Sequence, residues 1–196
     1  MTPSRIDNHP DHRPGLLLTL TEPPPAMAAE FNAWYDTEHM AERRMIPGVI
    51  SARRWVVLPG QTAVVKYAAT YELSSADVLT SPNYLRHVGQ GFTPWSARCL
   101  SACIAFKRWA CVGLDAPPRS ADANAQALAI ITSAQPLELS GVVGVRQFFD
   151  AQGGASQGQP AGLPYVCLVE CARIAAFDSL TTPAGATISL YQSYES

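Results

Sequence analysis

Short apolar runs alternate with longer helical patterns along the first half of the chain. Residues 16–21 (LLLTLT) form a short β-rich run that Glu22 and three prolines end. Between residues 26 and 45 the apolar side chains recur at spacings of three and four, which predicts an amphipathic helix, and the prolines before it suit a helix start. The alternating run 48–58 and the apolar run 64–73 predict two strands.

The next segment predicts two short helices and a closing strand. Ser74–Asp77 and Ser81-Pro82 have the residue types of helix starts. Residues 99–112 (CLSACIAFKRWACV) indicate the end of a helix followed by a strand. The resulting order, β-α-β-β-α-β, is that of a ferredoxin-like unit.

The second half of the chain repeats part of this pattern. In the repeat, Arg146 corresponds to Arg53 and Gln147 to Arg54, with glycine, valine and an aromatic residue in register around them. A short connection takes the place of the long first helix. The matching runs are LAIITS (128–133), SGVVGVRQF (140–148), PYVCLVEC (164–171) and TISLYQSY (187–194).

These patterns predict an α+β fold made of tandem ferredoxin-like repeats that form a dimeric α/β barrel within one chain, with the second repeat lacking its first helix. Each four-stranded sheet has one bare face, and packing the two sheets together buries both faces. We expect a disordered arm over residues 1–14, a first repeat over 15–114, a linker over 115–126 and a degenerate second repeat over 127–196.

Composition excludes several classes of protein. The chain has 196 residues, 47% hydrophobic and 15% charged, which is ample apolar material for a core. Its 14 Lys and Arg against 16 Asp and Glu leave no basic stripe for phosphates, so we expect no nucleic-acid partner. No apolar run approaches the roughly 20 residues that span a bilayer. The first 15 residues also lack the apolar segment of a secretory signal, so we expect a cytoplasmic protein without a membrane partner.

The cysteines and the missing motifs argue against a metal or a cofactor. Five cysteines cannot all pair within one chain, and their apolar surroundings predict reduced, mostly buried thiols. Neither C-x3-C pair has the usual spacing of a zinc site. The chain also lacks a glycine-rich nucleotide loop, a nucleophile elbow and an H-E-x-x-H motif, so we expect no metal and no cofactor.

One string of about 25 residues resembles a known family. It reads FNxWYDxEH from Phe31 to His39, continues with Pro47-Gly48, and ends in ARRW at Trp55. It is similar to the dimeric α/β-barrel superfamily, and in particular to small EthD-like proteins of bacterial catabolic clusters. The resemblance supports the predicted fold. It leaves the reaction open, because the superfamily contains isomerases, cyclases, cofactor-free monooxygenases and haem-degrading enzymes.

His39 is the strongest catalytic candidate. Imidazole changes charge near neutral pH, and Tyr35 lies one helical turn before it, so the two can share a pocket wall. The alternative is a structural histidine bonded to a backbone carbonyl, but the resemblance favours function because the matching histidine lies in the motif. Asp36 is a further catalytic candidate, although it lies on a different helical face. Its neighbours Glu42 and Arg43 are expected to be solvated.

Arg54 is the candidate for holding a carboxylate or a developing oxyanion by a forked bond. Because Arg53 has a counterpart in the second repeat, we assign it a structural role and leave Arg54 for function. The alternative for Arg54 is an internal ion pair with Glu38 or Glu72. The residues predicted to line a pocket for a flat, apolar ligand, or to take part in proton transfer there, are Trp34, Trp55, Tyr71, His87 and Trp95.

Three functional hypotheses follow. The first is a catabolic or biosynthetic enzyme that binds a small apolar, aromatic or polyketide-like molecule between the first helix and the first sheet. It would carry out isomerase, cyclase or lyase chemistry by cofactor-independent proton transfer, and the resemblance adds a monooxygenase to these options. The second is a non-catalytic EthD-like accessory or ligand-binding protein. The third is a haem-handling protein with His39 or His87 as axial ligand. A homodimer is compatible with all three.

Overall fold

The computed structural model describes residues 13–61, 64–139, 142, 144–150, 163–178 and 180–194. The predicted arm lies outside the described residues except for residues 13 and 14. The structure is an α+β fold with an eight-stranded, antiparallel closed barrel, as the sequence predicts. The strands follow one another around the barrel in the order β1-β3-β2-β8-β5-β7-β6-β4.

Each half of the chain supplies four neighbouring strands of the barrel. The first half contributes β1 (Gly15–Glu22), β2 (Val49–Val57), β3 (Tyr67–Leu73) and β4 (Ala105–Gly113). The second half contributes β5 (Ala127–Ser133), β6 (Val145–Asp150), β7 (Tyr165–Cys171) and β8 (Ala186–Ser193). Two seams close the barrel, where β2 pairs with β8 and β4 pairs with β6. Strand β3 begins three residues later than the apolar pattern suggests.

The strand register confirms the internal repeat. Arg53 lies opposite Thr70 across β2 and β3, and Arg146 lies opposite Leu168 across β6 and β7. The two arginines therefore occupy equivalent places in the two sheets, as the aligned sequence runs indicate.

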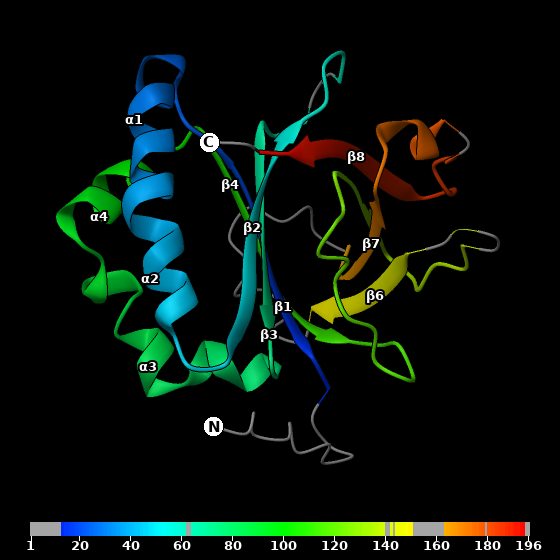
Figure 1. Ribbon diagram of the computed structural model, residues 1–196, viewed down its shortest axis with the longest axis horizontal. Helices are drawn as coiled ribbons and strands as arrows, with labels where there is room; N and C mark the ends of the chain where they lie inside the picture. Colours follow the sequence, from blue (N-terminus) through cyan, green and yellow to red (C-terminus); the bar gives the residue numbers. More distant parts are fainter. Residues whose placement is uncertain are drawn as a thin grey trace.

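The helices of the first half all cover the outer face of its sheet (Figure 1). A short turn, η1 (Pro25–Met27), leads into one continuous helix made of α1 (Ala28–Trp34), a π turn η2 (Tyr35–His39) and α2 (Met40–Met45). The rest of the layer consists of η3 (Ala76–Thr80), α3 (Pro82–Leu85), η4 (Gly89–Gly91) and α4 (Pro94–Ser101). In the second half, η5 (Ile174–Phe177) follows β7, and none of the described residues between β5 and β6 is helical, as expected for a repeat without its first helix.

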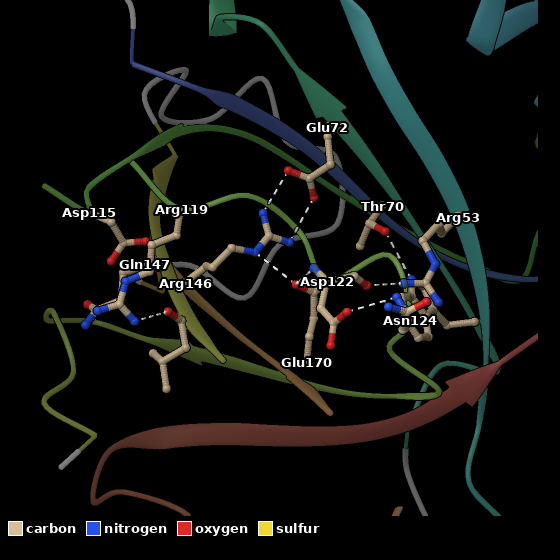
Figure 2. A network of polar contacts seen from close by, with 12 residues as sticks. Arg53, Thr70, Glu72, Asp115, Arg119, Asp122, Asn124, Arg146, Gln147 and Glu170 are labelled. Atoms are coloured by element: carbon tan, nitrogen blue, oxygen red, sulfur yellow. Dashed lines mark hydrogen bonds and ion pairs between the residues drawn. The ribbon is translucent and has the colours of Figure 1, made fainter. Parts of the chain in front are cut away.

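The barrel interior is an apolar core with an ionic network. Leucines of β1 and the fully buried rings of Trp55, Trp109 and Tyr191 belong to this core. Figure 2 shows Arg146 between two carboxylates, with its Nη atoms 2.7 and 2.9 Å from Glu72 and its Nε 3.0 Å from Glu170.

The equivalent arginine of the first half is bonded differently. Arg53 donates to the backbone carbonyls of Asp122 (Figure 2) and Ala125 in the segment between the halves. Its guanidinium lies 4.3 Å from the ring centre of Trp55. Arg53 thus ties that segment to the barrel, which is the structural role that the repeat predicts.

Candidate functional site

A cavity of about 640 Å³ lies between the outer face of the first sheet and the helix layer. The sheet contributes Leu17, Thr19, Tyr71, Phe106 and Arg108 to its wall, and the long helix contributes Tyr35, His39 and Arg43. The remaining wall comes from the segment that runs from η3 to α4, through Leu79, Tyr84, Leu85, Val88, Gly89, Phe92, Ala97, Leu100 and Ser101. This volume is within the range of small-molecule sites.

The π turn determines which side chains the long helix directs into the cavity. Within it the Met40 amide donates to the Tyr35 carbonyl, five residues back, so the turn contains one residue more than an α-helical turn. Tyr35, His39 and Arg43 form one stripe of cavity-lining side chains. The neighbouring stripe, with Asp36 and Met40, lines a separate pocket of about 150 Å³. Asp36 and His39 thus lie on different faces of the helix, as the sequence predicts.

His39 is a buried and incompletely bonded imidazole. Only 7% of the residue is exposed, and its ring centre lies 4.4 Å from that of Trp34 and 4.9 Å from that of Tyr35. Its Nδ1 has no hydrogen-bond partner among the described residues. Burial lowers the pKa of His39 well below its usual value, and the cations of Arg43 and Arg54 lower it further. The imidazole is therefore neutral near pH 7 and able to accept a proton.

Two tyrosine hydroxyls meet beside the imidazole. The Oη atoms of Tyr35 and Tyr71 lie 3.4 Å apart, and both residues line the cavity. Burial, together with the neighbouring Tyr35, raises the pKa of Tyr71 well above its usual value. Tyr71 thus stays protonated and can donate a hydrogen bond.

Arg43 is buried, and the expectation that it is solvated is wrong. The residue is 3% exposed, donates to the backbone carbonyl of His87, and lies 5.8 Å from the ring centre of Tyr84. The segment that contains α3 covers its guanidinium, and such long-range packing cannot be derived from helical periodicity. The regular spacing of Tyr35, His39 and Arg43 was the available signal, since each lies four residues from the next.

Arg54 lies outside the cavity, in an ion pair that the sequence did not predict. Its Nη atoms are 2.8 Å from Asp36 and 2.8 Å from Asn32, so its partner is neither Glu38 nor Glu72. Its guanidinium also lies 4.2 Å from the ring centre of Tyr35. Arg54 and Asp36 therefore support the helix and line the smaller pocket.

Most of the other predicted pocket residues have packing roles. Trp34 is fully buried behind His39 and donates to Ser96 at 3.1 Å. Trp55 lies in the barrel interior, and Trp95 donates to Glu30 at 3.1 Å. Neither the side chain of Trp95 nor that of His87 lines the cavity, so of the five predicted binding residues only Tyr71 does.

The cavity gathers incompletely bonded polar groups. Within the described part of the chain, four buried side-chain atoms lack a hydrogen-bond partner, and three of them belong to cavity residues: Thr19 Oγ1, His39 Nδ1 and Arg43 Nε. Leaving such a group unsatisfied costs about 1–3 kcal/mol. Their concentration around one hollow is typical of a binding site for a polar ligand.

The described residues show no group of side chains suited to a metal ion. All five cysteines are free thiols, and burial raises the pKa of several, to about 11 for Cys103. No helix in the described ranges is long and apolar enough to cross a membrane.

Comparison with known proteins identifies the fold. No family model and no curated protein matches the sequence. Among solved structures, the chain is similar to an anthrone oxidase-like protein at a TM-score of 0.60, with 10% identity over 94% of this chain and 92% of the other. It is also similar to a proposed monooxygenase of Fusobacterium nucleatum, at a TM-score of 0.57 with 10% identity over 94% of each chain. A proposed monooxygenase of Lactobacillus acidophilus follows at 0.55, with 8% identity over 93% and 94%. At these identities the likeness shows the shared dimeric α/β-barrel fold.

Proposed function

We propose that the protein is a small-molecule enzyme that removes a proton from an aromatic or polyketide-like substrate without a cofactor. The observation that carries the proposal is the neutral, buried imidazole of His39 on the wall of a ligand-sized cavity. A neutral imidazole that faces a cavity has the protonation state that a general base needs, and such catalysis contributes about 10²–10⁴-fold.

The surrounding groups suit the anion that proton removal creates. Abstraction of a proton next to a carbonyl, or from a phenol, places negative charge on oxygen. The hydroxyls of Tyr35 and Tyr71 can donate to that oxygen. We therefore assign the oxyanion-holding role that the sequence suggested for Arg54 to these two hydroxyls.

Proton removal is a common first step for the activities under consideration. The resulting carbanion or enolate can be reprotonated at another position, can close a ring, or can react with dioxygen. The neighbours described as an anthrone oxidase-like protein and as proposed monooxygenases support the last of these options. As part of the same proposal, the protein is EthD-like and is located in the cytoplasm.

Substitution of the base tests the proposal. Turnover of a panel of anthrones, hydroxylated quinone precursors and 1,3-dicarbonyl polyketides is followed by absorbance and by mass spectrometry. His39→Ala should lower turnover of the active substrate by about 10²-fold or more while the circular dichroism stays unchanged. His87→Ala is the matched control, because the His87 side chain does not line the cavity. Unchanged turnover in folded His39→Ala would refute the proposal.

The unsatisfied polar groups also favour a second function, ligand binding without catalysis. In that case the panel compounds would bind and be recovered unchanged after prolonged incubation in air. The haem hypothesis has less support, because an axial histidine usually donates its second ring nitrogen to an acceptor, and Nδ1 of His39 has no such partner among the described residues. A Soret band that appears on haem addition and is lost in His39→Ala would revive it.

A further inference from the structure

The charges on the cavity wall are all of one sign. Arg43 and Arg108 line the cavity, whereas no Asp or Glu is among its lining residues. Three carboxylates of the helix that carries Arg43 are bonded elsewhere: Asp36 to Arg54, Glu38 to Thr93 at 2.6 Å and Glu30 to Trp95 at 3.1 Å. The described lining thus includes the cation of Arg43 and no carboxylate.

Arg43 is the more deeply buried of these two cations. The residue is 3% exposed, and no carboxylate of the described residues forms an ion pair with it. The His87 carbonyl accepts from one Nη atom, and Nε has no partner within the described ranges. A buried cation is costly unless a partner of opposite charge is supplied. This geometry contrasts with that of Arg146, which has two carboxylate partners in the same protein.

We infer that the natural ligand carries a carboxylate that binds Arg43, on an apolar body that fills the rest of the cavity. The inference rests on the proposed function and names its substrate class. A carboxylate accepts the forked pair of bonds that a guanidinium offers. The apolar body would contact Leu17, Leu79, Val88, Leu100 and Phe106, which line the remaining wall.

Charge neutralisation at Arg43 would also affect the base. The positive charge of Arg43 is one cause of the lowered pKa of His39. A bound carboxylate offsets that charge, so His39 becomes a stronger base once the substrate is in place. By binding Arg43, the ligand would therefore strengthen the base that removes its own proton.

Two probes of matched shape test the inference. Binding of 2-naphthoate and of neutral 2-naphthamide to the full-length protein is measured by isothermal titration calorimetry. The wild-type protein should prefer naphthoate by about tenfold or more, which is the effect of one charge-assisted pair. Arg43→Met should abolish this preference and Arg43→Lys should keep part of it. The adjacent Arg44→Met should retain it in full, because Arg44 lies outside this cavity and donates to the carbonyl of Ala52.

Three results would overturn the inference: equal affinity of the wild-type protein for the two probes, no binding of naphthoate up to millimolar concentration, or a preference that survives in Arg43→Met. If Arg43→Met does not fold, the wild-type comparison and Arg43→Lys still decide. The proposed function fails separately, through undiminished turnover in His39→Ala. If the wild-type protein prefers naphthoate but His39→Ala turns over substrate undiminished, the proposed ligand class would be supported and the role of His39 as the base would be refuted.

Discussion

The two halves of the barrel have equivalent strands, yet their outer faces differ in chemistry. The strand pairings identify equivalent positions in the two sheets, and the polar cavity residues of the first sheet have apolar equivalents in the second. Ile131 is the equivalent of Thr19, Val169 that of Tyr71 and Ile188 that of Arg108. The first face lies under the long helix and borders the cavity. The second packs against Leu137, Leu139 and Phe177. One backbone plan therefore supports a candidate site in one half and an apolar face in the other.

A second contrast lies inside the barrel, between the equivalent Arg53 and Arg146. Arg146 pairs with two carboxylates, whereas Arg53 is bonded to backbone carbonyls. The two halves thus share the position of the arginine but differ in the groups that it binds.

Loss of Arg146 should have the largest effect. Arg146→Met leaves the buried Glu170 and the partly buried Glu72 without their cation, which should lower the free energy of unfolding by about 3–5 kcal/mol. Arg53→Met should cost less, because it removes the donor of two neutral backbone carbonyls and leaves no carboxylate without its cation. Urea denaturation of both variants measures the difference. Equal losses of unfolding free energy in the two variants would contradict this difference between the two arginines.

Substitution of the cavity residues of the first sheet by their equivalents from the second sheet should eliminate ligand binding in the cavity. The variant Thr19→Ile, Tyr71→Val, Arg108→Ile replaces three polar cavity residues by their counterparts. It should weaken binding of the naphthoate probe by about 100-fold, or about 2.7 kcal/mol. Calorimetry measures the affinity, and circular dichroism checks the fold. A folded triple variant that binds as tightly as the wild-type protein would contradict the role assigned to this face.

His39 should make stability depend on pH. In the unfolded chain its imidazole takes up a proton near its usual pKa of 6.5, whereas the folded protein resists protonation until the pH is well below that value. Protons therefore favour the unfolded state, and the wild-type free energy of unfolding should fall relative to His39→Gln as the pH drops below about 6.5. The difference grows by at most ~1.4 kcal/mol per pH unit. Parallel pH profiles of the two proteins would disprove the burial of a neutral imidazole.

Thr19 should give the smallest effect, and one of opposite sign. Thr19→Val removes a buried hydroxyl without a partner among the described residues and keeps the shape of the side chain. The unliganded protein should become more stable by about 1 kcal/mol in thermal or urea unfolding. Thr132→Val is the control in the second half, since the Thr132 hydroxyl lies 2.7 Å from that of Thr187. A loss of stability in Thr19→Val would mean that its hydroxyl is satisfied in solution.

The fold could be derived from the sequence because its signals are local and repeated. Strand alternation, the proline-led helix and the matched runs around Arg53 and Arg146 are all visible in the printed chain. Together they identify four strands in each half and the missing helix of the second. The closure of the barrel follows from two sheets that each have one bare face.

The candidate site could be derived only in part, because its wall depends on long-range packing. The spacing of Tyr35 and His39 correctly placed them on one stripe. The π turn has no recognisable sequence signal here, and the covering of Arg43 by the segment around α3 depends on residues more than forty positions away. Arg54 was chosen for its forked donors, but the nearby Asp36 and Asn32 already bind them.

The central claim is that His39 is a neutral base beside the uncompensated cation of Arg43, in a cavity that receives an anionic ligand. Nuclear magnetic resonance of isotope-labelled histidine measures this directly, with the His39 signal identified by its absence in His39→Gln. The account predicts that His39 titrates well below its usual pKa of 6.5 in the free protein, and at higher pH once 2-naphthoate is bound. An unshifted titration near 6.5, unchanged by the ligand, would contradict it.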